Sequence, residues 1–399
     1  MKLSEELQWR GFVAEHTLDD ISALDKAPRK FYWGVDPSAS SMTIGNLAAL
    51  MMVKCFMRHG YPAVLLAGGA TGQIGDPKEN GERDLKPLSE VEANVRGLEA
   101  QFRRIAGEDF EVVNNNDWFA EIRFIPFLRE VGKQFSMTQL LDRKFVQERI
   151  GDGGAGISYA EFSYSLIQGY DFLHLYREKG VGLQLCGADQ FGNCVSGVHL
   201  IKRLEDKEAD VWSCPLIVDK VSGRKFGKSE GNAVWLDGEM TSVWDFYQFW
   251  LGLADDGIAT YLKVYTLITP DELTELLAEH NEKPSERIAQ KKLAYEATRI
   301  VHGEEKAKGV ARATEVLFGG AKLTEADFDQ LAKFLPTFAT GMTVVDVLVQ
   351  SGISNSRAEA KQLIKSGAIA VAGQKIDNDL KIGERALVKR GKNKFIIVR

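Results

Sequence analysis

The sequence predicts an α/β protein built on a parallel sheet, and three observations carry the prediction. Phe31–Val35 is an apolar run that passes through a tight turn into a helix opening near Gly45. Ala63–Ala67 is apolar without interruption, as expected of a strand buried on both faces of a parallel sheet. Residues 181–186 are expected to form another strand, which ends in the polar cluster at residues 187–190. Open α/β sheets bind ligands beyond the carboxyl ends of their strands, so we expect a ligand site there.

Length and composition are those of an ordinary globular protein. The 399 residues are enough for two or three domains, and 44% apolar residues suffice for their cores. No run approaches the roughly 18 apolar residues of a membrane helix, and the polar N-terminus does not read as a secretory signal. We therefore expect a cytoplasmic protein with no membrane partner. The cysteines show neither a CxxC pair nor a metal spacing, which favours buried free thiols and no metal site: Cys55, Cys186, Cys194 and Cys214.

Charge is unevenly distributed along the chain. Residues 340–399 carry a net charge of +6, so the remainder carries −12 of the overall −6. A basic segment on an acidic body suggests contact with a polyanion. On charge alone, a solvated basic face is an equally good interpretation.

The second half of the chain is organised differently from the first. From residue 237 the pattern is helical, with helix starts at Thr269, Ser285 and Thr324. Residues 337–341 read as a linker. Beyond it, the pattern predicts short helices and strands: residues 344–352, 356–366, 368–371, 386–389 and 394–398. We therefore predict three domains: 1–236, α/β; 237–336, all-α; and 340–399, small and α+β.

Three polar features mark candidate functional residues. In the helix predicted for residues 158–175, Tyr164, Gln168 and Asp171 share one face. Such faces are most often solvated, but the surrounding helix is apolar and aromatic. The glycine-rich residues 68–77 follow a strand and let the backbone approach a ligand. The run Lys225-Phe226-Gly227-Lys228-Ser229 would read as an ordinary surface segment without the other motifs.

Together, these stretches resemble the bacterial tyrosyl-tRNA synthetases, a family of class I aminoacyl-tRNA synthetases. The resemblance covers nearly the whole chain. It is carried by these stretches: YWGVDPSAS (32–40), GGATGQIGDP (68–77), NNNDW (114–118), ISYAEFSYSLIQGYDFLHL (157–175), QLCGADQFGN (184–193) and KFGKS (225–229). It implies a Rossmann-like catalytic domain with a dimerising insertion, a helical domain and a small RNA-binding domain, which residues 343–375 resemble. RNA binding then explains the basic tail better than a solvated face does.

The resemblance implies a reaction in two steps. Tyrosine attacks the α-phosphate of ATP to give tyrosyl-adenylate and pyrophosphate, and the tyrosyl group then moves to the 3′ end of tRNA(Tyr). The substrate carboxylate is the nucleophile, so positioning and charge stabilisation must carry the catalysis. Mg²⁺ would accompany the ATP phosphates, held mainly by phosphate and water. The implied partners are tRNA(Tyr), tyrosine, ATP and a second copy of the chain.

The resemblance also implies roles for individual residues. The phenol requires polar partners, which rejects phenylalanine because those partners would be left unpaired. The implied tyrosine-binding residues are Tyr32 and Asp171 for the phenol, Asp76, Tyr164 and Gln168 for the ammonium, and Gln190 for the carboxylate. The implied ATP-binding residues are Gly34, Asp36, Gly45, Gly187, Asp189 and Lys228. The implied catalytic residues are Thr43, Asn46, Lys225, Lys228 and Ser229. The implied tRNA-binding residues are Arg357, Lys361, Lys365 and Lys375.

Two features depart from the family pattern. The usual His-Ile/Leu-Gly-His signature reads Thr43-Ile44-Gly45-Asn46, so both imidazoles are missing, although the Asn46 amide can still donate a hydrogen bond. The loop after Pro77 is poor in lysine and keeps only Lys78 and Arg83. Both changes weaken pyrophosphate handling, so we expect an active but slow enzyme.

Three alternatives remain open. A catalytically silent RNA-binding paralogue would be expected to lose the Lys225 and Lys228 pair or the tyrosine pocket. A tryptophanyl enzyme of the same class fits less well, because Tyr32 and Asp171 suit a phenol better than an indole. A different α/β nucleotidyltransferase would not need the basic tail. Exchange of pyrophosphate into ATP with each amino acid would separate these readings.

Overall fold

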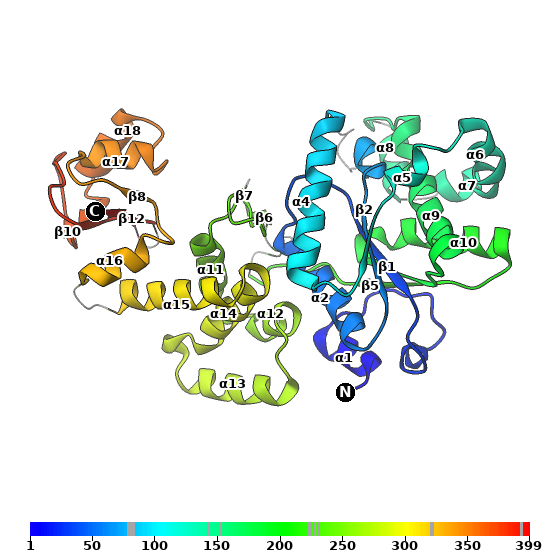
Figure 1. The fold of residues 1–399 in the computed structure, drawn as a ribbon, viewed down its shortest axis with the longest axis horizontal. Coiled ribbons are helices and arrows are strands. Elements are labelled where there is room, and N and C mark those ends of the chain that lie inside the picture. Colours follow the sequence, from blue (N-terminus) through cyan, green and yellow to red (C-terminus); the bar gives the residue numbers. More distant parts are fainter. Residues whose placement is uncertain are drawn as a thin grey trace. The chain divides into compact units, whose positions relative to one another are not determined.

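The computed structural model describes residues 1–77, 84–141, 144–151, 153–221, 223, 226, 228–229, 232–319, 323–391 and 394–399 (Figure 1). The chain forms two compact units. The first comprises Met1–Asp237 with Ala254–Ala278, and the second comprises Gly238–Leu253 with Glu279–Arg399. The three-domain division stays a prediction. Among the described residues, no helix is long and apolar enough to cross a membrane.

A five-stranded parallel sheet forms the centre of the first unit, with strand order β3-β2-β1-β4-β5. Its strands are β1 (Phe31–Val35), β2 (Ala63–Ala67), β3 (Glu111–Asn114), β4 (Leu183–Gly187) and β5 (Asp210–Cys214). The predicted parallel α/β architecture is confirmed. The sequence did not predict β5, because Asp210 and Ser213 interrupt its apolar pattern although the strand is almost wholly buried.

Helices cover both faces of this sheet, with α2 and α4 on one side and α9 and α10 on the other (Figure 1). Phe31 and Trp33 pack on the first pair through Phe56 and Phe102, with ring centroids 5.6 and 5.8 Å apart. The second face forms a cluster that includes Tyr32 and residues of α9 and α10. The helices of this unit are α1 (Leu3–Arg10), α2 (Ile44–Arg58), α3 (Thr71–Ile74), α4 (Leu88–Ala106), α5 (Asn116–Phe119), α6 (Phe124–Glu130), α7 (Met137–Leu141), α8 (Lys144–Ile150), α9 (Tyr159–Lys179), α10 (Phe191–Glu205) and α12 (Ile258–Tyr265).

The strand order places a topological switch point between β1 and β4. From β1 the chain proceeds to β2 on one side, and from β4 it proceeds to β5 on the other. The connecting helices therefore lie on opposite faces, and a crevice opens beyond the carboxyl ends of the two central strands. The polar residues expected to bind a ligand follow these two strands directly.

The second unit contains a helical part and a small α+β part. Its helices are α11 (Val243–Leu251), α14 (Ile288–His302), α15 (Glu304–Phe318), α16 (Glu325–Leu331), α17 (Val344–Gln350) and α18 (Arg357–Lys365), and α13 (Pro270–Glu282) spans the boundary between the units. Its sheet has the order β10-β9-β11-β12-β8. The strands are β8 (Thr337–Phe338), β9 (Ile369–Val371), β10 (Gln374–Lys375), β11 (Ala386–Arg390) and β12 (Lys394–Val398).

Two local predictions in this unit were wrong. Thr337–Phe338, expected to be part of a linker, pairs with β12 as a parallel edge strand, because the neighbouring strand supplies hydrogen bonds that a sequence pattern cannot show. The helix expected to start at Ser285 begins at Ile288, because Arg287 has a left-handed backbone with φ of 54° that interrupts helical geometry. The predicted helix starts at Thr269 and Thr324 are confirmed by their reciprocal hydrogen bonds with Glu272 and Asp327.

Candidate functional site

A cavity of about 510 Å³ lies at the switch point of the first unit. It collects nearly all the residues that the sequence singled out for tyrosine and ATP: Tyr32, Gly34, Asp36, Thr43, Gly45, Asn46, Asp76, Tyr164, Gln168, Asp171, Gly187, Asp189 and Gln190. Lys225 lies outside the described residues. Of Lys228 and Ser229 only the backbone is described; it forms the short strand β6 (Lys228–Ser229), which pairs with β7 (Asn232–Ala233).

Asp171 lies at the deep end of the cavity, with 2% of its surface exposed. The Asn115 amide donates to one carboxylate oxygen at 3.1 Å, and the Trp118 indole donates to the other at 2.9 Å. Burial raises the pKa of Asp171 to about 8, although both donors act in the opposite direction. The carboxyl group is therefore held in place by two donors and remains able to accept a further hydrogen bond from a ligand.

The hydroxyl of Tyr32 has no hydrogen-bond partner among the described residues, although it is buried. Tyr32 stacks obliquely on Phe172 at 5.4 Å, which fixes its ring. Its pKa is raised well above the ordinary value by burial. A buried hydroxyl without a partner costs free energy, which a polar ligand group can recover.

Three oxygen acceptors lie around the middle of the cavity. Tyr164 donates its proton to Asp36 at 2.7 Å, so its oxygen keeps lone pairs for a ligand. Gln168 directs its amide nitrogen at the Cys194 thiol at 3.5 Å, and its amide oxygen has no partner in the described part of the chain. The Asp76 carboxylate accepts from the Gln190 amide at 2.8 Å. The other oxygen of Asp76 accepts from the Asn193 amide at 3.3 Å, and all three residues line the cavity.

Backbone glycines keep this region compact. A Cβ atom on Gly68 would lie 2.3 Å from both Asp36 and Thr71, which are themselves joined by a 2.6 Å hydrogen bond. A Cβ on Gly187 would lie 2.8 Å from the Asp189 carboxylate. Any side chain at these two positions would displace a carboxylate that lines the cavity.

The mouth of the cavity is formed by the first turn of α2. Asn46 directs its amide oxygen at Thr43, accepting from the Thr43 backbone N–H and hydroxyl at 3.0 Å each. The amide nitrogen of Asn46 is thereby turned away from Thr43. It adds a donor to the N-terminus of α2, where backbone N–H groups and the helix dipole favour an anion.

Several residues that contact Asp171 or line the cavity were missed in the sequence. Asn115 and Trp118 belong to a stretch that carried the family resemblance, but no role was assigned to them. Their contact with Asp171 joins segments more than 50 residues apart, which only the fold reveals. Gln184, a neighbour of Tyr32 in the sheet, also lines the cavity and has a buried amide oxygen with no described partner. A glutamine inside an otherwise apolar strand is the signal that could have found it.

The four residues predicted to contact tRNA are exposed. Arg357, Lys361 and Lys365 recur every four residues along α18, so they share one helix face. Arg357 also forms an ion pair with Asp346. Lys375 lies on the edge strand β10. The arrangement provides a positively charged helix face.

Comparison with known proteins agrees with this geometry. Residues 24–319 match the family of class I tRNA synthetases for tryptophan and tyrosine, and residues 327–399 match the C-terminal domain of tyrosine–tRNA ligases. The fold and the cavity thus define a class I aminoacyl-tRNA synthetase.

The full-length relatives specify which synthetase family within this class the chain resembles. The tyrosine–tRNA ligases of Streptococcus suis and Geobacillus kaustophilus are 38% and 39% identical to this chain, with 100% of each chain covered. A truncated mitochondrial tyrosyl-tRNA synthetase of Aspergillus nidulans has a similar structure, with a TM-score of 0.72 and 28% identity over 79% of this chain and 94% of that one. The chain belongs to the tyrosine–tRNA ligase family.

Proposed function

We propose that the chain activates L-tyrosine with ATP and transfers the tyrosyl group to tRNA(Tyr). The tyrosine carboxylate attacks the α-phosphate, a P–O bond forms, and the bond to pyrophosphate breaks. The observation that best supports tyrosine as the substrate is the pair of buried polar groups at the deep end of the cavity. Asp171 is oriented by two donors, and Tyr32 has a buried hydroxyl with no hydrogen-bond partner among the described residues.

One phenol matches both groups. Its O–H donates to Asp171, and its oxygen accepts from the Tyr32 hydroxyl. Phenylalanine would bury both groups without partners, and tryptophan would bring only a single N–H donor. Enzymes of this family discriminate between tyrosine and phenylalanine by about 10⁵, which is an established property of the class.

The substrate ammonium is assigned to the three acceptors in the middle of the cavity. An ammonium group offers three N–H donors, which correspond to Tyr164, Gln168 and Asp76. Gln190 lies beside Asp76 and would contact the substrate carboxylate. Binding at both ends of tyrosine would direct its carboxylate towards the α2 terminus, where ATP is expected.

The nucleotide is assigned to the outer cavity. Gly34 and Gly187 leave room for adenosine, and Asp189 would accept a hydrogen bond from a ribose hydroxyl, with Asp36 beside the substrate. The Asn46 amide and the α2 N-terminus would bind phosphate. We propose that Mg²⁺ enters with ATP and is held by phosphate oxygens and water.

The remaining assignments concern partners. The exposed basic face of α18, with Lys375, would bind the tRNA backbone. A homodimer would bury Phe124 and Ile125, which are 62% and 69% exposed on α6. A cytoplasmic location stays a prediction.

Exchange of labelled pyrophosphate into ATP tests the proposal. We expect exchange that depends on tyrosine and is at least ~10³-fold weaker in kcat/KM with phenylalanine or tryptophan. Charging of tRNA(Tyr) should follow under the same conditions. Absence of exchange with every amino acid would favour the silent RNA-binding paralogue, whereas exchange that needs no amino acid would favour a different nucleotidyltransferase. Preference for tryptophan would overturn the assignment of Tyr32 and Asp171.

A further inference from the structure

The motif that contains the two predicted catalytic lysines has an aromatic anchor. Phe226 lies between Lys225 and Lys228 in sequence and is only 4% exposed. Its ring stacks on Tyr261 at 4.6 Å and on Tyr265 at 5.6 Å, both on α12. Its backbone N–H donates to Ile217 at 2.9 Å. The position of Phe226 therefore depends on the position of α12.

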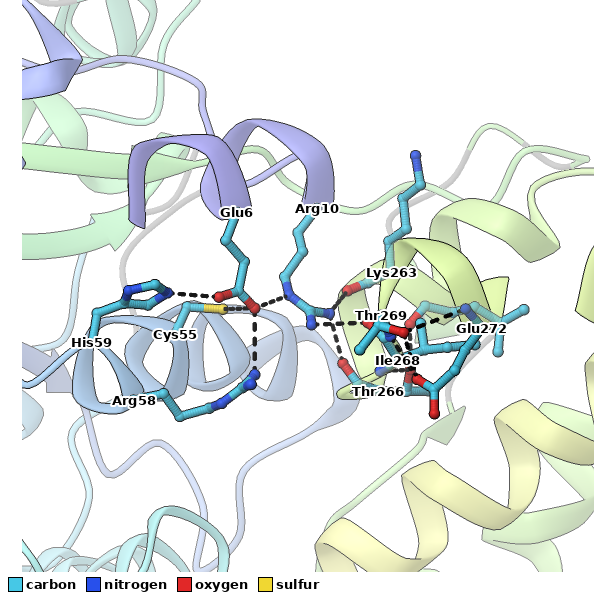
Figure 2. A network of polar contacts seen from close by, with 11 residues as sticks. Glu6, Arg10, Cys55, Arg58, His59, Lys263, Thr266, Ile268, Thr269 and Glu272 are labelled. Atoms are coloured by element: carbon cyan, nitrogen blue, oxygen red, sulfur yellow. Dashed lines mark hydrogen bonds and ion pairs between the residues drawn. The ribbon is translucent and has the colours of Figure 1, made fainter. Parts of the chain in front are cut away.

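Helix α12 is short, and its C-terminal end is fixed by a residue from the start of the chain. Arg10 donates through Nη1 to the carbonyl oxygens of Lys263 at 2.7 Å and Thr266 at 2.9 Å, and through Nη2 to that of Ile268 at 3.1 Å (Figure 2). Carbonyls at a helix C-terminus lack intrahelical partners, and the helix dipole favours a cation there. One guanidinium thus satisfies three carbonyls.

Arg10 is in turn held by Glu6, one turn earlier in α1. The Nε–H of Arg10 donates to Glu6 at 2.8 Å, and the two side chains are 3% and 6% exposed. Glu6 also accepts from His59 at 2.8 Å and from Arg58 at 3.3 Å, at the C-terminal end of α2 (Figure 2). The hydrogen bonds and positive charges around it outweigh the effect of burial, so the pKa of Glu6 lies below its ordinary value.

The Glu6–Arg10 pair consequently joins two helices that serve the phosphate end of the cavity. At the far end of α2, Thr43 caps the helix and Asn46 lies in its first turn, and α12 packs against Phe226. The segment after the lysine motif is tied to α2 as well, because Ile44 donates to Val234 at 3.0 Å. Phe226 is therefore held against α12, and Val234, which follows the motif, is held against the start of α2.

We propose that Glu6 and Arg10 are positioning residues for adenylate formation: by fixing α12 relative to α2, they set the position of Phe226, which lies within the sequence motif of the two predicted catalytic lysines. This inference rests on the proposed function. It assigns a positioning role to a pair that does not line the cavity and lies 22 residues or more in sequence from every residue that does. The pair should affect the rate of the chemical step and not the affinity for tyrosine, because the residues assigned to the substrate tyrosine lie on other elements, chiefly β1 and α9.

The test is Arg10→Met, which keeps the aliphatic stem and removes the guanidinium. We expect the rate constant of tyrosyl-adenylate formation to fall ~10- to 100-fold, since small misplacements of catalytic groups cost about this much. The dissociation constant of tyrosine, followed by intrinsic fluorescence, should stay within twofold. Equal losses in both quantities, or no loss of rate, would overturn the proposal.

Arg58→Met is the matched control. It removes another cation from the same Glu6 carboxylate, and the hydrogen bond and ion pair of Arg58 go to Glu6 and not to the carbonyl oxygens at the end of α12. Because Arg58 is 48% exposed and its contact is 3.3 Å, its loss should change the adenylate rate by less than about threefold. A fall as large as that of Arg10→Met would show that Glu6 acts by supporting the fold in general.

A double-mutant cycle with Phe226→Leu tests the route. If Arg10 acts through Phe226, the double variant should be no more than about threefold slower than the slower single variant. If the rate losses of the two single variants multiply in the double variant, Arg10 does not act through Phe226. Should Arg10→Met fail to fold, Arg10→Lys keeps the charge but offers three N–H donors in place of the four hydrogen bonds that Arg10 makes, and the same rate-specific loss is expected. Absence of exchange in the unmodified chain would refute the proposed function, whereas an active chain with a normal Arg10→Met rate would refute only this inference.

Discussion

The two ends of the cavity are built in contrasting ways. At the tyrosine end, Asp171 and Tyr164 are buried, and their orientations are fixed by hydrogen bonds within the first unit. At the phosphate end, Thr43 and Asn46 are partly exposed and offer only short side chains and a helix terminus. Recognition of the amino acid is therefore preorganised, whereas phosphate chemistry depends on segments placed by remote contacts. Mutations should divide accordingly, into those that change the choice of amino acid and those that change only the rate.

The largest effect is expected from a deletion outside the cavity. It tests whether the two ends of the cavity form the adenylate without residues 340–399. Deleting residues 340–399 should reduce tRNA charging by ~10³-fold or more while sparing adenylate formation, because the basic face of α18 would be lost. Charging and pyrophosphate exchange are measured on the same preparation.

Truncation also removes Phe395, which packs on Trp244 in the second unit, so a gentler control is needed. Replacing Lys361 and Lys365 together by Glu leaves this packing intact. The charging KM for tRNA should rise and exchange should not change. Unaltered charging by the truncated chain would refute the assignment.

The next largest effect concerns the tyrosine end. Asp171→Asn removes the charged acceptor and leaves Asn115 and Trp118 competing for one amide oxygen. We expect kcat/KM for tyrosine to fall ~100-fold or more in pyrophosphate exchange, with phenylalanine changed less than about threefold. Asp189→Asn, in the part of the cavity assigned to ATP, is the control. It should lower kcat/KM for tyrosine and for phenylalanine by the same factor. Equal losses for both amino acids with Asp171→Asn would contradict its assignment to the phenol.

A smaller, rate-specific effect is expected at the phosphate end. Asn46→Asp preserves the acceptor that binds Thr43 but replaces the outward amide donor by a negative oxygen. Adenylate formation should slow ~10- to 100-fold, while thermal stability stays equal or rises because an acidic side chain suits a helix N-terminus.

Asn46→His serves as the comparison variant for this position. It restores the family's usual donor, and we expect it to match or exceed the rate of the unmodified chain, with an unchanged tyrosine dissociation constant. An Asn46→Asp chain as fast as the original would show that the Asn46 amide does not contribute to phosphate binding.

The sequence was most informative where function depends on local order. The apolar strands and the polar residues that follow them predicted the sheet and the side of it that binds ligands. Tyr164, Gln168 and Asp171 could be grouped because helical periodicity places them on one face. The lysine motif could be recognised from its sequence, although Lys225 lies outside the described residues.

What the sequence could not show depends on contacts between distant segments. Glu6 and Arg10 read as an ordinary i, i+4 surface pair, and only the packing of α1 against α2 and α12 makes them a buried link. Likewise, nothing local in residues 114–118 indicates that Asn115 and Trp118 would bind Asp171. The strand β5 was missed for the same reason, because burial in the sheet outweighs the weak pattern of Asp210–Cys214.

The smallest effect is a dependence of tyrosine binding on pH. Burial raises the pKa of Asp171 to about 8, so much of it is protonated at neutral pH before ligand binds. The phenol O–H donates to the ionised carboxylate, so tyrosine binds the deprotonated form, and its association constant should rise up to ~10-fold between roughly pH 6.5 and 8. Binding at pH 7 should release a proton, detected by calorimetry in two buffers with different ionisation enthalpies.

Measuring phenylalanine binding over the same pH range distinguishes the ionisation of Asp171 from that of the ligand's own amino group. It shares the ammonium but has no phenol to donate, so its binding should lack the slope, and Asp171→Asn should remove the slope for tyrosine. A tyrosine affinity that is flat or falls over this range would contradict the assignment. Burial makes an ionised Asp171 costly when no ligand is bound, and for the same reason it favours ligands that carry a hydroxyl. The partly exposed phosphate end has no comparable means of discrimination.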